Sequence, residues 1–204
     1  MRIGIMGGTF NPPHTGHINA ANVAKKELSL DKLIFIPTAL PPHKELAVGS
    51  ATALQRLEMT RLAAELAGAE TSDIEISRGG KSYTADTLKE LIKLYPGDQL
   101  WLIMGTDMFM TLEEWKTPEK IFELAKIAVI PRCNGDREML LRYAEKLLEK
   151  YGAATRIIDA PAVTISSSEL RMEKLTEEQK KYIPEKVMSY ITENKLYSLE
   201  ADKS

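Results

Sequence analysis

Short apolar runs alternate with longer amphipathic segments along most of the chain. Short runs closed by glycine or proline are typical of buried strands, and longer segments with apolar residues at helical spacing are typical of helices. The pattern predicts strands at residues 3–6, 33–36, 74–76, 100–104, 127–131 and 155–158. It predicts helices at residues 15–28, 51–67, 84–94, 121–124, 137–151, 168–175 and 184–194.

The order of these elements indicates the fold class. A strand, a helix and a second strand within residues 3–36 make one βαβ unit, and the later elements continue the alternation. We therefore expect an α/β fold: a Rossmann-like, doubly wound parallel sheet with flanking helices and a small C-terminal helical part. Residues 1–198 are expected to form a single domain, and residues 199–204 a frayed tail.

Charge and composition then exclude several classes of protein. The 204 residues include 27 Lys and Arg against 29 Asp and Glu, a net charge of −2, so the basic excess typical of nucleic-acid binding is missing. The single cysteine cannot form an internal disulfide, and no apolar run reaches the roughly 18 residues of a membrane span. We expect a cytoplasmic protein with neither a nucleic-acid nor a membrane partner.

The segment richest in candidate chemistry follows the first strand, at residues 7–17 (GGTFNPPHTGH). Adjacent glycines allow main-chain N–H groups to approach a phosphate, and the start of a helix favours an anion. If that helix begins near Thr15, His14 and His17 point toward the same ligand. The segment therefore predicts an anion-binding site where doubly wound sheets bind their ligands.

Simpler interpretations of this segment stay open. A Gly-Gly turn with two prolines can merely connect a strand to a helix, although the whole string of eleven residues makes this less attractive. The P-loop and dinucleotide-binding patterns are both missing from the sequence. A zinc site built from His14, His17 and His43 would use every histidine of the chain without any cysteine cluster, so we expect no metal site made by protein side chains.

The same residues carry a resemblance to a known family. Residues 14–17 (HTGH) resemble the His-x-Gly-His signature of the nucleotidyltransferase superfamily, and residues 7–17 resemble the bacterial nicotinate-nucleotide adenylyltransferase family. Four later segments resemble blocks of that family in the same order: residues 36–44 (IPTALPPHK), 82–87 (SYTADT), 105–107 (GTD) with Trp115, and 165–171 (ISSSELR). The departures are Ser168, where threonine is common, and residues 133–135 (CNG).

The resemblance implies a reaction and its substrates. The phosphate of nicotinate mononucleotide would attack the α-phosphorus of ATP directly and in line, without a covalent enzyme intermediate, giving nicotinate adenine dinucleotide and pyrophosphate in NAD biosynthesis. The implied partners are ATP and nicotinate mononucleotide, with Mg²⁺ carried in on ATP as the cofactor. The oligomeric state is left open, a homo-oligomer included.

The resemblance also assigns roles to residues. His17 is expected to contact the α-phosphate through the transition state, and His14 the neighbouring phosphates of ATP, both as hydrogen-bond donors. The residues expected to bind ATP and its phosphates are Gly7, Gly8, Thr9, Phe10, Lys44, Gly105, Asp107, Ile165, Ser166, Ser167 and Arg171. Those expected to bind nicotinate mononucleotide are Asn11, Tyr83, Thr84, Ala85 and Trp115.

Local sequence context supports part of the specificity. Thr84 is a candidate N-cap, and the N–H groups that follow it would favour the pyridine carboxylate that nicotinate carries and nicotinamide lacks. Trp115 lies among charged residues and is expected to stack on the pyridinium ring, whereas Trp101 lies in an apolar strand and is expected in the core. Asp107 suits a ribose hydroxyl, a magnesium-bound water or a helix cap.

The segment at residues 165–171 also has two interpretations. Ser166 and Glu169 fit an ordinary capping box at a helix start. The same helix start, with Arg171 on one face, would suit the β- and γ-phosphates, because a guanidinium group can grip a phosphate with two hydrogen bonds. A cap does not prevent phosphate binding, so the two interpretations are compatible.

Three rival functions are weighed against the preferred one. Enzymes for the amidated substrate and phosphopantetheine adenylyltransferases are the nearest rivals within the superfamily. The length of the chain, residues 82–87 and Trp115 argue against a phosphopantetheine enzyme. A catalytically silent nucleotide-binding regulator is disfavoured because His14, His17 and Arg171 are all present.

Overall fold

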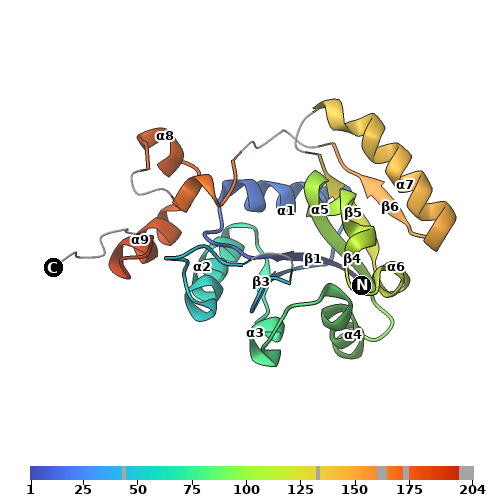
Figure 1. The fold of residues 1–204 in the computed structure, drawn as a ribbon, viewed down its shortest axis with the longest axis horizontal. Helices are drawn as coiled ribbons and strands as arrows, with labels where there is room; N and C mark the ends of the chain where they lie inside the picture. The colour runs from blue at the N-terminus through green and yellow to red at the C-terminus, as the bar shows by residue number, and fades with distance from the viewer. Residues whose placement is uncertain (43–44, 132–133, 160–164, 172–174, 198–204) are drawn as a thin grey trace.

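The computed structural model describes residues 1–42, 45–131, 134–159, 165–171 and 175–197. One sheet of six parallel strands runs through the molecule in the order β3-β2-β1-β4-β5-β6 (Figure 1). The strands are β1 (Arg2–Gly8), β2 (Lys32–Pro37), β3 (Glu70–Thr71), β4 (Gln99–Gly105), β5 (Lys126–Ile130) and β6 (Thr155–Ile157). The order changes direction between β1 and β4, as in a doubly wound sheet, which confirms the expected Rossmann-like fold.

Helices cover both faces of the sheet, and α1 and α4 lie on opposite sides of it in Figure 1. The α-helices are α1 (Thr15–Glu27), α2 (Ala53–Leu66), α3 (Ile74–Arg78), α4 (Thr84–Leu94), α5 (Thr106–Met110), α6 (Pro118–Leu124), α7 (Arg137–Tyr151), α8 (Glu177–Lys180) and α9 (Glu185–Glu193). Short 3₁₀ helices occupy Leu112–Glu114, Asn134–Asp136 and Glu169–Arg171. Helices α8 and α9 form the small C-terminal helical part, at the opposite end of the molecule from α7.

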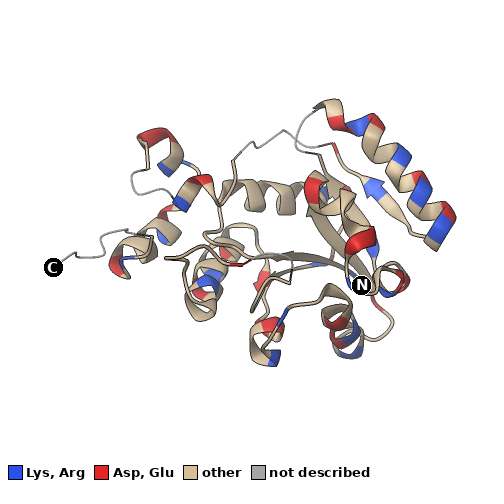
Figure 2. Ribbon diagram, viewed as in Figure 1, with Lys and Arg blue, Asp and Glu red and all other residues tan. Residues whose placement is uncertain are grey.

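Two apolar cores result from the alternation of side chains along the buried strands. Ile3 and Ile5 of β1 face the core made with α4, α5, α6 and α7, whereas Met6 faces the core made with α1, α2 and α9. Successive residues of β2 also alternate between the two cores. Because both faces are covered, the central strands β1, β2, β4 and β5 are largely apolar. The charged residues gather on outward-facing helices such as α7 (Figure 2). Among the described helices, none has the length and apolar character needed to cross a membrane.

The third predicted strand is wrong. Residues 74–76 begin helix α3, and the strand that pairs with β2 on the side away from β1 is the preceding segment Glu70–Thr71. The two residues of β3 are polar, so no apolar pattern marks this strand in the sequence. The alternation at residues 74–76 is too short to distinguish a strand from a helical turn. The short helices α5 and α8 were also not expected from the sequence.

The predicted helix at residues 168–175 is also wrong in its described part. Only one 3₁₀ turn forms, at Glu169–Arg171. The guanidinium Nη1 of Arg171 donates to the carbonyl of Ser167 at 3.0 Å, the acceptor that an α-helix would reserve for the main-chain N–H of Arg171. The reciprocal bonds between Ser166 and Glu169 are those of a capping box, as the sequence indicates. Residues 172–174 and the predicted tail at 199–204 lie outside the described residues.

Candidate functional site

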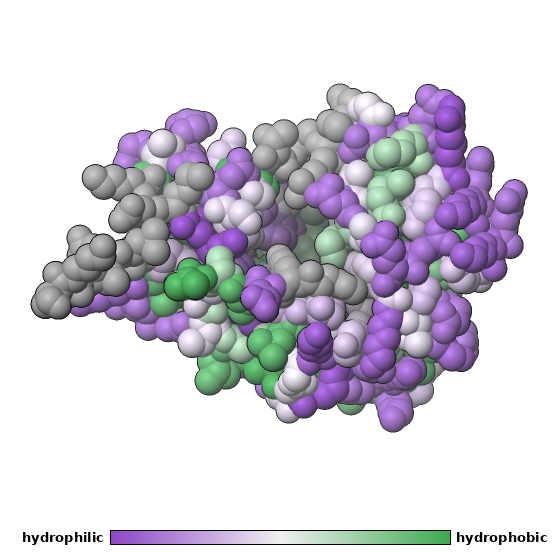
Figure 3. All heavy atoms as spheres, viewed as in Figure 1, coloured by the Kyte–Doolittle hydropathy of each residue, from purple (hydrophilic) through white to green (hydrophobic). Residues whose placement is uncertain are grey.

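A cavity of about 880 Å³ opens at the carboxyl ends of the central strands, where β1 meets β4. The face drawn in Figure 3 is hollowed near its centre. The cavity brings together sixteen of the residues predicted for the site: Gly7, Gly8, Thr9, Phe10, Asn11, His14, His17, Tyr83, Thr84, Gly105, Asp107, Trp115, Ile165, Ser166, Ser167 and Arg171. Ala85, the second residue of α4, is fully buried in the core. Lys44 lies outside the described residues, as does His43.

The two histidines of the first loop lie at the start of α1. The helix begins at Thr15 with His14 as its N-cap, and the two imidazole rings are 3.9 Å apart between centroids. The main-chain N–H of His14 donates to Nδ1 of His17 at 3.2 Å. Because Nδ1 accepts this bond, the proton of the neutral imidazole resides on Nε2. His17 therefore offers an Nε2–H donor, as the sequence-based role requires.

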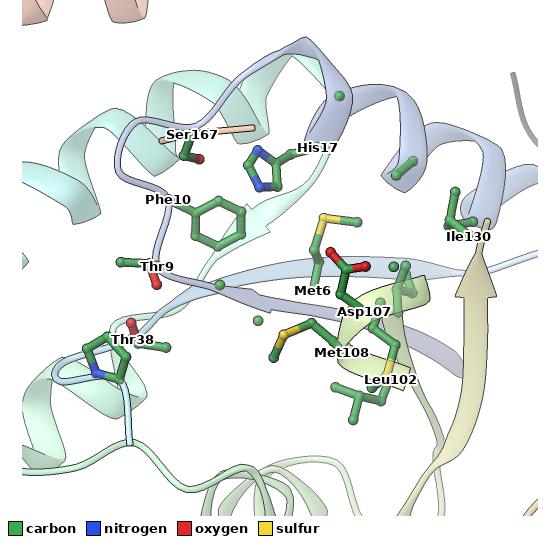
Figure 4. Close-up of a pocket in the computed structure, with 18 of the residues that line it drawn as sticks. Met6, Thr9, Phe10, His17, Thr38, Leu102, Asp107, Met108, Ile130 and Ser167 are labelled. Atoms are coloured by element: carbon green, nitrogen blue, oxygen red, sulfur yellow. The ribbon is translucent and has the colours of Figure 1, made fainter. Parts of the chain in front are cut away.

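The ring of Phe10 packs against the imidazole of His17. Its ring is 1% exposed, meets the His17 ring edge to face at 5.0 Å, and stacks on Phe35 at 5.5 Å between centroids. Figure 4 shows Phe10 and His17 side by side. A Cβ on Gly8 would come within 3.2 Å of the Phe10 ring, so Gly8 leaves room for this support. The Phe10 side chain thus orients His17, and only its main chain remains for the predicted contact with ATP.

Gly7 has a different role from Gly8. It lines the cavity at the end of β1, and a Cβ at this position would meet no other atom within 4 Å. The missing side chain leaves the space beside the strand end open to a ligand, in the way predicted for a phosphate-binding glycine.

The protein environment lowers the pKa of His17 well below 6.5, first through burial of the imidazole and then through the neighbouring charge of His14. Part of the side chain still opens to the cavity, so the ring is shielded by protein atoms yet remains within reach of a ligand. In the free protein His17 is therefore neutral at pH 7. The neutral imidazole keeps its Nε2–H, so no proton has to be gained before it can donate.

This pKa leads to a testable pH dependence. We expect kcat/KM for MgATP to change less than about threefold between pH 7 and 9, because kcat/KM reports the free enzyme and His17 is already neutral there. The measurement is initial rates in buffers of constant ionic strength with saturating Mg²⁺. A fall of about tenfold per pH unit above pH 6.5 would show instead that a protonated histidine is required.

Arg171 and Ser167 join the C-terminal part of the chain to the first loop. Nη1 of Arg171 donates to the carbonyl of Asn11 at 2.6 Å, and the Ser167 hydroxyl donates to the carbonyl of Pro12 at 2.8 Å. Nη2 of Arg171 also donates to the Ser168 hydroxyl at 3.1 Å. The basic group predicted for the β- and γ-phosphates thus lies directly beside the loop predicted for the α-phosphate.

The other end of the cavity is formed by the start of α4. The N-cap is Tyr83, so the expectation of Thr84 as the cap is wrong by one residue. The first main-chain bonds of the helix are donated by Asp86 and Thr87 to the Tyr83 carbonyl, and the N–H groups of Thr84 and Ala85 take no part in them. A positively polarised helix end therefore borders the cavity, as predicted for binding a carboxylate.

Two side chains that follow the 3₁₀ helix Leu112–Glu114 complete this end. Trp115 is half-buried, lines the cavity, and its Nε1–H donates to the Thr111 hydroxyl at 3.3 Å. Lys116 also lines the cavity, with Nζ 4.0 Å from the centroid of the Tyr83 ring. Sequence reasoning missed Lys116, although its position next to Trp115 could have indicated it. Trp101, expected in the core, is only half-buried at the edge of the apolar cluster.

Asp107 lies at the end of β4, in the first turn of α5, and its exposed side chain lines the cavity. The N-cap of α5 is Gly105, which removes the helix-cap interpretation of Asp107. Within the described part of the chain, no three His, Cys, Asp or Glu side chains gather as a metal-binding group. Asp107 is a single carboxylate and suits a hydroxyl or a hydrated Mg²⁺ carried by a phosphate.

Two buried charged residues that sequence reasoning missed hold the walls of the cavity. Arg56 of α2 is 0% exposed and donates to the carbonyls of Thr9 and Ala39, each at 2.9 Å. Glu75 of α3 lines the cavity and accepts from the Thr87 hydroxyl at 2.7 Å, and burial raises the pKa of its carboxyl. Arg56 thus joins the loops after β1 and β2, and Glu75 joins α3 to α4.

Comparisons with known proteins show the family to which the chain belongs. A model of the cytidylyltransferase-like family matches residues 5–173. A probable nicotinate-nucleotide adenylyltransferase of Citrifermentans bemidjiense is 39% identical over 97% of this chain and 98% of its own length. One from Desulfitobacterium hafniense is 39% identical over 97% of this chain and 96% of its own length.

Solved structures show the same fold. The Plasmodium falciparum nicotinic acid mononucleotide adenylyltransferase complexed with NaAD superposes with a TM-score of 0.78 at 21% identity, covering 96% of this chain and 97% of its own. The same Plasmodium protein complexed with APC gives a TM-score of 0.75. The family model and the full-length relatives together identify the chain as a member of the cytidylyltransferase-like family and, within it, of the nicotinate-nucleotide adenylyltransferases.

Proposed function

We propose that this protein transfers the adenylyl group of MgATP to nicotinate mononucleotide, releasing pyrophosphate and forming nicotinate adenine dinucleotide in NAD biosynthesis. The observation that carries the proposal is a single cavity with two chemically different ends. One end presents the histidine donors and Arg171, and the other presents the start of α4 with Trp115 and Lys116. The names of the full-length relatives and the NaAD complex of the Plasmodium protein support this assignment.

At the histidine end, the reaction depends on positioning and charge neutralisation. The attacking phosphate is already ionised, so no general base has to remove a proton. The phosphate oxygen of the acceptor forms a bond to the α-phosphorus as the bond to the pyrophosphate oxygen breaks, and the electron pair leaves with pyrophosphate. His17 donates through Nε2–H to the α-phosphate as its charge redistributes, and His14 contacts the phosphates beside it. Arg171 supplies positive charge for the leaving group.

Mg²⁺ enters this proposal as part of the substrate. It neutralises charge on the triphosphate and keeps most of its water, as this ion commonly does. Asp107, exposed on the cavity wall just after β4, offers a carboxylate to a magnesium-bound water or a ribose hydroxyl.

At the other end, the start of α4 discriminates between acceptors. The N–H groups of Thr84 and Ala85 and the ammonium of Lys116 favour the carboxylate of nicotinate over the neutral amide of nicotinamide. Trp115 offers an aromatic face to the pyridinium ring, which carries a positive charge. This arrangement favours nicotinate mononucleotide over the amide, and it provides no reason to prefer phosphopantetheine.

The test is pyrophosphate release from MgATP with nicotinate mononucleotide, nicotinamide mononucleotide or phosphopantetheine as the acceptor. We expect kcat/KM for the nicotinate compound to exceed that for the amide by about tenfold to a hundredfold, the range of one charge-assisted hydrogen bond. A preference for the amide would refute the specificity argument while leaving the chemistry intact. Release with none of the three would refute the proposed function.

A further inference from the structure

Asn11 is a junction between distant parts of the chain. Its side chain is 2% exposed, and Nδ2 donates to the Ser50 hydroxyl at 2.9 Å. The main-chain N–H of Ala51 donates to Oδ1 at 3.3 Å, so the amide fixes the segment just before α2. A third bond reaches the same Oδ1 from Tyr197, whose hydroxyl donates at 2.7 Å. Three of the hydrogen-bonding positions of this amide are therefore used inside the protein.

The main chain of the same loop holds the candidate phosphate-binding groups. The carbonyl of Asn11 accepts from Arg171, and the next carbonyl, that of Pro12, accepts from Ser167. The position of the Asn11 amide therefore bears on Arg171, and His14 follows three residues later at the start of α1. A shift of this loop would move both groups relative to bound ATP phosphates.

Tyr197 is held firmly although it lies near the end of the chain. It is the last described residue, beyond α9, and its ring packs against the core formed with α1, α2 and α9, with its hydroxyl 3.9 Å from Sδ of Met59. Its φ of +61° is in the left-handed region, which a tyrosine adopts only where its surroundings impose it. Burial raises the pKa of Tyr197, so the hydroxyl keeps the proton that it donates.

We propose that Tyr197 is a positioning residue for adenylyl transfer, because its hydroxyl fixes the Asn11 amide and thereby the loop and Arg171 against the ATP phosphates. Tyr197 is not among the residues that line the cavity, and it acts from beyond α9 through Asn11. The inference rests on the proposed function for its kinetic consequences. The hydrogen bond between Tyr197 and Asn11 joins residues that are 186 positions apart in sequence, and it does not depend on which acceptor is used.

The test removes one hydroxyl from the full-length chain. Tyr197→Phe is expected to raise KM for MgATP and lower kcat/KM for MgATP by about five- to tenfold, the effect of losing one hydrogen bond. KM for nicotinate mononucleotide should change less than about twofold, because its pyridine end binds near α4. The Asn11 side chain, predicted from the sequence to bind this substrate, is instead bonded to Ser50, Ala51 and Tyr197. A purely structural role would lower the melting temperature without this separation of the two KM values.

Tyr190→Phe is the matched control. Tyr190 lies on α9 and packs against the same core, but among the described residues no hydrogen bond joins its hydroxyl to the first loop. Its kcat/KM should stay within about 1.5-fold of wild type. Tyr197→Phe should also add little further loss in an Asn11→Ala background, because the two residues act as one unit. Equal kinetics for the two tyrosine variants, or fully additive losses with Asn11→Ala, would overturn the inference.

A binding measurement separates this inference from the proposed function. Calorimetry with the magnesium complex of α,β-methylene ATP reports nucleotide binding without turnover. We expect Tyr197→Phe to weaken this binding by about five- to tenfold and Tyr190→Phe to leave it unchanged. If the wild-type protein binds the analogue but turns over no acceptor, the proposed function fails and the binding comparison still decides on Tyr197. Equal binding by wild type and Tyr197→Phe would overturn the positioning role.

Discussion

Replacing His17 by alanine is expected to lower kcat for pyrophosphate release by about a hundredfold to a thousandfold, the usual cost of removing one donor to a transition-state oxyanion. His17 presents Nε2–H toward the cavity from the first turn of α1, and its ring orientation is fixed by the bond from the His14 N–H and by Phe10. Because this donor is oriented before ATP binds, its loss affects the transition state more than ground-state binding.

The control for His17→Ala must separate lost chemistry from lost structure. Lys26→Ala changes an exposed residue in the last turn of the same helix and should leave kcat within about twofold of wild type. Both variants should retain the wild-type circular dichroism spectrum. A loss smaller than about tenfold in a folded His17→Ala protein would contradict the assigned role of His17.

Replacing Arg56 by methionine is expected to reduce the free energy of unfolding by about 2–4 kcal/mol, because the carbonyls of Thr9 and Ala39 lose the charged donor that they share. The side chain is 0% exposed, so water cannot easily replace the lost bonds. Methionine fills much of the volume of the apolar part of the arginine side chain, which limits the destabilisation that an empty cavity would add. Urea unfolding followed by circular dichroism measures the change.

Arg61→Met is the matched control on the same helix. The Arg61 side chain is 55% exposed and forms an ion pair with Glu58 at 3.3 Å, so its replacement should cost less than about 0.5 kcal/mol. We also expect the Arg56 variant, and not the Arg61 variant, to lose activity at temperatures where it is still folded, because Thr9 lines the cavity. Equal unfolding free energies for the two variants would show that Arg56 does not hold the two loops together.

Much of the fold follows from local sequence patterns. Continuous apolar runs such as residues 100–104 indicate strands buried on both faces, and they recur at intervals that fit βαβ units. The pattern fails where the structure depends on pairing at an edge, as at Glu70–Thr71, whose polar residues extend the sheet only because β2 lies beside them. It fails again at residues 168–175, where a bond from the Arg171 side chain takes the place of a helical one.

The residues of the candidate site also fall into two groups, those that local sequence patterns predict and those that only the folded chain brings together. The first loop and the start of α4 are each one continuous segment of sequence, so the residues within each segment could be predicted together. The structure places both segments around one cavity. The first loop is held in place by residues much later in the sequence, Arg56 and Tyr197. Arg56 carried a usable signal, because it falls at helical spacing with the buried Met59 and Ala63 on the inner face of α2. Tyr197 carried none, because only the folded chain brings it to Asn11.

The most direct test of the proposed function is the identity of the dinucleotide formed when the wild-type protein is given MgATP and equal concentrations of nicotinate and nicotinamide mononucleotides. Separation of the products by mass or charge gives the ratio of the two kcat/KM values from one mixture. The cavity geometry predicts that nicotinate adenine dinucleotide predominates by at least about tenfold, with one pyrophosphate released per dinucleotide. Predominance of the amidated dinucleotide, or pyrophosphate release without any dinucleotide, would contradict it.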